Sequence, residues 1–77
     1  MSTILKKEMN KFSQRLKELR RERGLTQQGI AGLLNIKQQS YIRYEYGTGE
    51  PSLNTLIKLT QIFEVTADYL LGISDDY

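Results

Sequence analysis

The residues from Lys37 to Arg43 carry side chains that can hydrogen-bond to base edges in duplex DNA. Glutamine pairs with adenine through two hydrogen bonds, and arginine pairs in the same way with N7 and O6 of guanine. Gln38, Gln39 and Arg43 supply both types within one short helical stretch, and the major groove is wide enough to admit one helix. This stretch is therefore a candidate DNA-reading surface, although such residues are also common on solvated helix faces.

The composition excludes most other kinds of functional site. The chain has no Cys and no His, so disulfides, thiolate metal sites and the commonest general base are absent. It also lacks a nucleophile–base pair and a glycine-rich phosphate loop, and we expect no enzyme activity, no metal and no cofactor. The longest apolar run is far shorter than the roughly 20 residues that cross a bilayer, and no signal-peptide pattern opens the chain. We therefore expect a cytoplasmic protein without membrane contacts.

Charge is divided unevenly along the chain. Residues 1–48 contain ten basic and four acidic residues, a net +6, whereas residues 49–77 contain one basic and five acidic residues, a net −4. Such a division suggests a polyanionic partner on the basic side. It is weak evidence alone, since basic helix surfaces are often just solvated. We interpret the run of Arg20, Arg21 and Arg23 as mostly such a solvated face, near a helix end where cations are favourable.

A chain of 77 residues allows one domain, and its apolar periodicity predicts five helices and no strand. The start of the first helix is open. Leu5 and Met9 continue its apolar stripe back to about Thr3, whereas Ser13 would cap a shorter helix behind a flexible arm; in either case Gly24 follows the helix end. The rest of the stripe consists of Phe12, Leu16 and Leu19.

Four shorter helices are expected after the first, separated by residues that cap or terminate helices. The expected caps and terminators are Thr26, Asn35, Gly47, Ser52, Thr66 and Gly72. In the third helix, Tyr41 and Tyr44 are spaced to face the core. The fourth is predicted to bury a wide apolar face made by Leu53, Leu56, Ile57, Leu59, Thr60 and Phe63.

Several short motifs follow one another at fixed spacings: RLKELRRERGLTQ from Arg15, the small residue Ala31, the turn at Asn35, RYEYG from Arg43, Pro51-Ser52-Leu53, and DYLLG from Asp68. Together they resemble the lambda-repressor-like helix-turn-helix domain, the Cro-type or xenobiotic-response-element class of bacterial and phage regulators. The resemblance covers residues 12–72, leaving 1–11 as an N-terminal extension (helix or arm) and 73–77 as a C-terminal tail. It implies a compact, all-α, five-helix domain whose third helix enters the major groove while the second crosses the DNA backbone.

The resemblance also implies roles for individual residues. Gln38, Gln39 and Arg43 would read bases, and Arg20 and Glu45 match a structural ion pair between the first and third helices. The candidates for contacts with the DNA backbone are Thr26, Gln27, Lys37, Ser40, Tyr46 and Thr48. The candidates for a dimer surface are Leu70, Leu71 and Ile73. Leu71 and Ile73 alternatively only close the core of the monomer.

Some positions depart from the family pattern. Lys37 stands where a Ser or Thr usually caps the third helix, and loss of such a cap costs about 0.5–2 kcal/mol. Tyr41 occupies a core position more often given to Ile or Val. Ile42 lies where a polar residue is expected and either contacts a thymine methyl group or shields Tyr41 from water. Glu64 ends the fourth helix where Gly is common, which implies strain or a different chain exit.

The resemblance implies a bacterial or phage-encoded transcriptional regulator that acts as a repressor and associates with the nucleoid. It would bind a two-fold symmetric operator in double-stranded DNA as a homodimer. The alternative is a protein-interaction module or antitoxin of the same fold, whose main partner is another protein; exposure of Leu5, Met9 and Phe12 would support it. Binding to phosphates weakens steeply with salt, whereas an apolar interface barely responds, so salt dependence separates the two.

Overall fold

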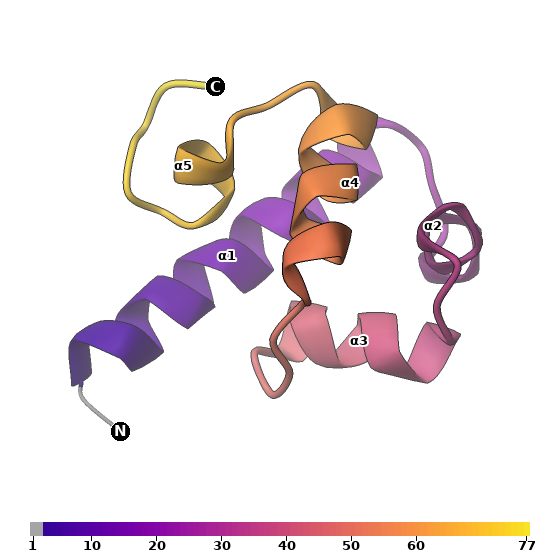
Figure 1. The fold of residues 1–77 in the computed structure, drawn as a ribbon, viewed down its shortest axis with the longest axis horizontal. Helices are drawn as coiled ribbons and strands as arrows, with labels where there is room; N and C mark the ends of the chain where they lie inside the picture. Colours follow the sequence, from indigo (N-terminus) through magenta and orange to yellow (C-terminus); the bar gives the residue numbers. More distant parts are fainter. Residues whose placement is uncertain (1–2) are drawn as a thin grey trace.

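The computed structural model describes the backbone of residues 3–77 and the side chains of residues 11–77. Five α-helices joined by short connections, with no strand, make up this part of the chain (Figure 1), as the sequence predicts. The helices are α1 (Thr3–Glu22), α2 (Gln27–Leu34), α3 (Gln38–Tyr46), α4 (Leu53–Phe63) and α5 (Ala67–Leu70). The expected stripe residues Leu5 and Met9 lie outside the described side chains.

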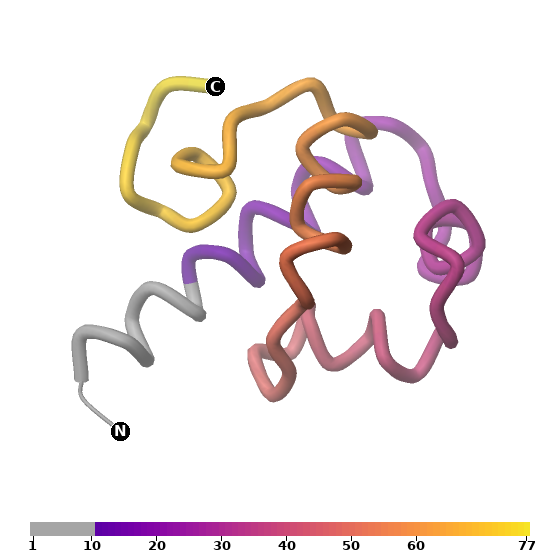
Figure 2. Tube along the Cα trace, in the orientation of Figure 1, coloured from indigo at the N-terminus to yellow at the C-terminus, as the bar shows by residue number. Residues whose placement is uncertain are grey.

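The long helix α1 joins opposite ends of the domain. Helix α3 packs against it, as does α5, while α2 packs against α3 and α4. Tracing the chain in Figure 2 shows α2 and α3 on one side of the molecule, with α5 and the C-terminal tail on the other. The shared core is formed by Phe12, Leu16, Leu19, Ile30, Ala31, Leu34, Tyr41, Tyr44, Leu59, Phe63, Val65 and Leu70.

Ser13 is an interior residue of α1, because the helix begins at Thr3, the earlier of the two starts considered. Its buried hydroxyl donates a hydrogen bond to the carbonyl oxygen of Tyr44 at 2.6 Å. A residue that would have capped a shorter helix therefore joins α1 to α3. The helix continues through residue 12 without a break.

Local capping accounts for most of the other helix ends. The hydroxyl groups of Thr26, Ser52 and Thr66 each accept a hydrogen bond from the backbone N–H three residues later, at 2.9, 3.2 and 3.0 Å. Asn35 ends α2 in the left-handed conformation, with φ 56° and ψ 45°, which Asn tolerates better than most residues. Lys37 precedes α3 without a side-chain cap bond. These features agree with the sequence.

The end of α4 shows how the strain expected at Glu64 is held in place. Glu64 has φ 55°, a conformation that is costly for a residue with a Cβ atom. Arg23 of the loop after α1 donates to the carbonyl oxygen of Phe63 at 2.9 Å, and its cationic group suits the negative end of the helix dipole. Arg23 is exposed, as expected of a solvated face, and its guanidinium group also anchors the last turn of α4. The solvated-face interpretation is wrong for Arg20, whose side chain is only 11% exposed.

The buried face of α4 is narrower than the sequence predicts. Leu53 and Ile57 are 78% and 53% exposed, respectively. The residues that α4 buries are Thr55, Leu59 and Phe63, which recur every four positions and form a single stripe. Leu56 and Ile62 are half-buried against the core beside this stripe, so of the predicted face only Leu53 and Ile57 turn to solvent.

The C-terminal tail, residues 73–77, folds back onto α1 through Arg15. The guanidinium group of Arg15 donates to the carbonyl oxygens of Tyr69 and, at 2.6 Å, Ser74. It also forms an ion pair with Asp75 at 2.8 Å and lies 4.2 Å from the centroid of the Tyr69 ring. The ring of Tyr77 stacks on that of Tyr69 with centroids 4.5 Å apart. Arg15 therefore connects α1 to Ser74 and Asp75 of the tail and to Tyr69 of α5.

The prediction that Leu70 belongs to a dimer surface is wrong. Leu70 is 0% exposed because α5 turns it inward between α1 and α4, leaving no surface for a second molecule. Leu71 is half-buried against the core, and Ile73 is 66% exposed. Within the described residues, no helix is long and apolar enough to cross a bilayer, and no group of acidic side chains is arranged to hold a metal ion.

Candidate nucleic-acid interface

Helix α3 separates its buried and exposed residues clearly. Tyr41 and Tyr44 are buried and pack edge to face, with ring centroids 6.1 Å apart and an angle of 75° between the rings. Ser40 and Ile42 are half-buried. The exposed residues include Lys37, just before the helix, and Gln38, Gln39 and Arg43 within it. The predicted base-reading residues therefore share the solvent side of one short helix that is anchored by two buried rings.

A tight turn places α3 against α2. Asn35, in the left-handed conformation, donates its N–H to the carbonyl oxygen of Gly32 at 3.1 Å. The N–H of Ile36 bonds to the carbonyl oxygen of Ala31 at 3.0 Å, and Ala31 itself is only 2% exposed. This small buried residue allows the two helices to approach closely. Together α2, the turn and α3 form a helix-turn-helix.

A basic groove lies where the end of α1, the start of α2 and the end of α3 meet. It has a volume of about 440 Å³ and is lined by Lys17, Arg20, Arg21, Thr26, Gln27, Glu45 and Tyr46. Three of these side chains are cationic and one is anionic, so the lining has a formal charge of +2. The groove therefore attracts anions.

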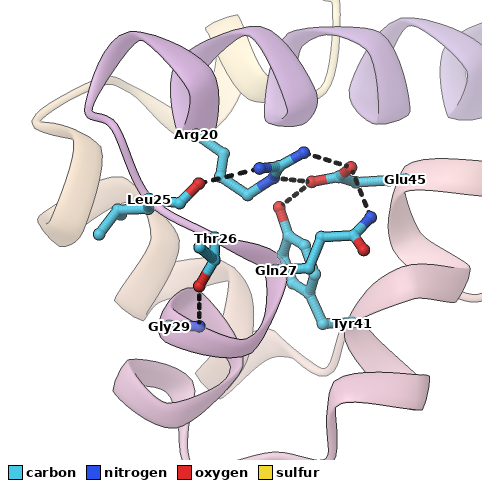
Figure 3. A network of polar contacts seen from close by, with 7 residues as sticks. All are labelled: Arg20, Leu25, Thr26, Gln27, Gly29, Tyr41 and Glu45. Carbon is cyan, nitrogen blue, oxygen red and sulfur yellow. Dashed lines mark hydrogen bonds and ion pairs between the residues drawn. The ribbon is translucent and has the colours of Figure 1, made fainter.

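A network of hydrogen bonds around Glu45 connects three helices behind this groove (Figure 3). The Nε of Arg20 donates to Oε2 of Glu45 at 2.6 Å and its Nη2 donates to Oε1 at 3.2 Å, while its Nη1 binds the carbonyl oxygen of Leu25 at 2.9 Å. The hydroxyl of Tyr41 donates to Oε2, and Nε2 of Gln27 donates to Oε1 at 3.2 Å. We call Arg20, Gln27, Tyr41 and Glu45 the Glu45 network.

Hydrogen bonding fixes the charge state of the Glu45 network. Burial by itself raises the pKa of the Glu45 carboxyl, but the hydrogen bonds from Arg20, Tyr41 and Gln27 outweigh this effect and lower its pKa below the usual value. The bond to Glu45 raises the pKa of Arg20. Burial, followed by the bond to Glu45, raises the pKa of the Tyr41 hydroxyl. Near neutral pH the network is therefore an ion pair with a neutral phenol.

The candidates for DNA-backbone contacts fall into two groups. Thr26, Gln27 and Tyr46 line the basic groove. The others are Lys37, which directly precedes α3, Ser40, which lies within it, and Thr48, which follows it. Lys37 precedes the exposed base-reading residues in the chain, and Tyr46 and Thr48 follow them. Gln27 differs from the expectation in one respect, because its amide nitrogen already binds Glu45.

The role of the Tyr41 hydroxyl was missed by reasoning from the sequence. Tyr41 was expected as a core residue, which its ring is, but its hydroxyl also reaches Glu45. The available signal was the spacing, since Tyr41 and Glu45 are four residues apart and residues at that spacing share a helix face. A tyrosine at a position usually occupied by Ile or Val, one turn before a buried carboxylate, indicates such a bond.

This helix-turn-helix with its exposed third helix defines a class of domain, and the chain belongs to the lambda-repressor-like helix-turn-helix family. The family model described as helix-turn-helix matches residues 16–70, which is most of the chain. The match spans α2, the turn, α3 and α4, and it includes both partners of the Arg20–Glu45 pair.

Three relatives are named as transcriptional regulators or as a transcriptional repressor. The SPbeta prophage-derived uncharacterized HTH-type transcriptional regulator YonR of Bacillus subtilis is 47% identical over 60 residues, covering 78% of this chain and 56% of that protein. The HTH-type transcriptional regulator ImmR of the same species is 42% identical, covering 79% and 48%. The cryptic phage CTXphi transcriptional repressor RstR of Vibrio cholerae is 34% identical, covering 83% and 58%. The chain spans about half the length of these relatives, and no solved structure gives a significant match.

Proposed function

We propose that this chain is a sequence-specific DNA-binding transcriptional regulator, acting as a repressor at the bacterial nucleoid, whose α3 enters the major groove. The observation that carries the proposal is the division of α3 into a buried face, with Tyr41 and Tyr44, and an exposed side with Gln38, Gln39 and Arg43. Membership of the helix-turn-helix family supports it, as do relatives named as transcriptional regulators and, in one case, as a repressor.

Base reading falls to the exposed side of α3. Gln39 and Arg43 are four residues apart and therefore lie on the same side of the helix, while Gln38 stands at its first position. The amide and guanidinium groups match the edges of adenine and guanine, respectively. Ile42 is half-buried, so part of its side chain is available to a thymine methyl group while the rest covers the core.

Backbone contacts would position this helix. The basic groove offers Thr26 and Gln27 at the start of α2, where backbone N–H groups and the helix dipole favour a phosphate. Lys37 has no cap bond to α3, which leaves the first N–H groups of that helix available to a second phosphate. Such contacts fix orientation without carrying sequence information.

We propose further that two copies bind a two-fold symmetric operator. One reading helix contacts only a few base pairs, and paired helices read half-sites about one helical turn apart. Of the dimer residues predicted from the sequence, Ile73 is 66% exposed and Leu71 is half-buried, so both stay candidates. Leu70 is excluded by its burial.

Selection of bound fragments from a random duplex pool, at near-physiological salt, tests the proposal directly. The expected result is an enriched two-fold symmetric motif with half-sites about one helical turn apart. Enrichment of a single half-site would support DNA reading but contradict the dimer. No enrichment by the folded protein would contradict DNA reading and favour the protein-interaction module.

Replacing a reading glutamine by alanine then tests the residues themselves. With Gln38→Ala or Gln39→Ala, we expect a loss of about 1–3 kcal/mol of discrimination at one base position, because a bidentate base contact is removed. The matched control is Gln61→Ala, which removes an exposed glutamine from α4. An unchanged base preference in either α3 variant would remove that glutamine as a reader.

A further inference from the structure

We infer that Glu45 is a positioning residue for DNA binding. It fixes the amide of Gln27, so that this side chain is already oriented when a phosphate binds. The inference rests on the proposed function, because it concerns a backbone contact made by Gln27. The Glu45 network then takes part in DNA recognition, in addition to holding α1 against α3.

The geometry of Gln27 carries the first step. Gln27 is the first residue of α2 and lines the basic groove. Its amide nitrogen has two N–H groups, and the bond to Oε1 of Glu45 at 3.2 Å uses one of them. The second N–H is left to donate to an anion in the groove. Without Glu45 the amide would lose this partner in the free protein and would have to be ordered when a phosphate binds.

Glu45 can hold Gln27 because its own carboxylate is fixed from three helices. Arg20 of α1 and Tyr41 of α3 bind it together with Gln27 of α2, as Figure 3 shows. The Glu45 side chain is only 5% exposed, so solvent does not compete for its oxygens. Its negative charge is balanced by Arg20, and the groove keeps a formal charge of +2.

Orientation before binding has a measurable consequence. A long side chain that becomes ordered only on binding loses conformational entropy, and that loss weakens the complex. Since Gln27 is already held, we expect loss of Glu45 to weaken binding through Gln27 by roughly two- to tenfold. The direct electrostatic effect has the opposite sign, because removing a negative charge beside the groove strengthens binding to a polyanion. The two effects can therefore be told apart.

A double-mutant cycle with Gln27→Met and Glu45→Gln tests the inference. Methionine keeps the length of the side chain but has no amide group, and Glu45→Gln removes the charge while keeping the size. Affinity is measured by fluorescence anisotropy on a mixed-sequence duplex of about 30 base pairs, roughly three helical turns, because backbone contacts do not depend on sequence. A salt concentration of about 50 mM keeps binding measurable, and circular dichroism confirms that each variant is folded.

We expect Glu45→Gln to weaken binding when Gln27 is present and to leave it equal or stronger when residue 27 has been changed to methionine. Tyr41→Phe, which removes one donor to the Glu45 carboxylate, should show the same dependence on Gln27 with a smaller factor. It also keeps the test open if Glu45→Gln does not fold. Asp75→Asn removes a negative charge from the distant tail and serves as the control for charge alone.

The failure of this inference is distinguishable from failure of the proposed function. If the wild-type protein binds duplex DNA but Glu45→Gln changes affinity by the same factor in both backgrounds, Glu45 has only a structural role and the inference is overturned. If the folded wild-type protein binds no duplex at low salt, the proposed function fails and the inference falls with it.

Discussion

Two arginines of α1 hold opposite ends of the domain, and their surroundings differ sharply. Arg20 binds Glu45 beside the helix-turn-helix, and the two side chains are only 11% and 5% exposed. Arg15 binds Asp75 in the C-terminal tail, where the arginine is 14% exposed but the carboxylate is 92% exposed. The same pair of chemical groups therefore occurs once with both side chains largely buried and once with the carboxylate at the surface.

From this difference we infer that the Arg20–Glu45 ion pair stabilises the helix-turn-helix end of the domain. The Arg15–Asp75 ion pair only accompanies the other contacts that hold the tail. Four hydrogen bonds, from Arg20, Gln27 and Tyr41, end on the Glu45 carboxylate, so the charge is central to the Glu45 network. Around Arg15 the buried contacts are to carbonyl oxygens and to the face of Tyr69, and Asp75 adds only an exposed partner. The reading end of the domain should therefore depend on charge far more than the tail end does.

The largest effect is expected from Glu45→Ala. It leaves the guanidinium group of Arg20 without its partner in a nearly buried position, and breaking such a pair typically costs about 3–5 kcal/mol. We expect about 3 kcal/mol here, because Arg20 borders an open groove. For a chain of this size that lowers Tm by more than about 10 °C, measured by circular dichroism. An unchanged melting temperature would show that the pair does not stabilise the domain.

The Glu45 network also predicts a pH dependence of stability. The folded protein holds the pKa of Glu45 below its usual value, so the unfolded chain binds the proton more readily. The carboxylate therefore stabilises the fold fully above the ordinary value of about 4.3, and this contribution is lost as pH falls through the lower folded pKa. We expect the difference in Tm between wild type and Glu45→Gln to shrink between pH 7 and pH 3. A constant difference would contradict this linkage.

The features predicted correctly from the sequence are mostly local. Thr26, Ser52 and Thr66 were identified as caps because a cap acts on a backbone N–H three residues away. Asn35 was identified as a turn because of its own conformational tolerance. These signals lie within one helical turn of the residue that carries them, so a single sequence contains them in full.

The features that were missed depend on partners far apart in the chain. Arg15 binds residues 54 to 60 positions away, and Arg23 reaches the end of α4. The spacing of residues on an exposed helix face does not predict which arginine will hydrogen-bond to a carbonyl oxygen of another element. Leu70 was misplaced for a related reason, since α5 has four residues and is too short for periodicity to define its buried side. The Arg20–Glu45 pair was expected only through the family resemblance.

A smaller effect is expected from Arg15→Ala, at about 1–2 kcal/mol. The variant loses charge-assisted hydrogen bonds to two carbonyl oxygens and the contact with the Tyr69 ring. Arg15→Lys keeps the charge but not the planar fork of donors, so it should restore less than half of the loss. Thermal melts of the three proteins measure this. Full recovery by lysine would mean that charge holds the tail, as it holds Glu45.

The smallest effect is expected from Asp75→Asn. This variant tests whether charge holds the tail, or whether the contacts of Arg15 with carbonyl oxygens and the Tyr69 ring do. Asp75 is 92% exposed, and many surface ion pairs make no measurable contribution to stability. Asparagine keeps an oxygen that can accept a hydrogen bond from Arg15 while removing the charge. We therefore expect an unchanged melting temperature at both low and high salt. Glu45→Gln should differ, because it removes a nearly buried charge and one of two carboxylate oxygens that both accept hydrogen bonds. A clear, salt-sensitive loss with Asp75→Asn would show that the exposed pair stabilises the tail, and the contrast between the two ends of α1 would then be one of degree.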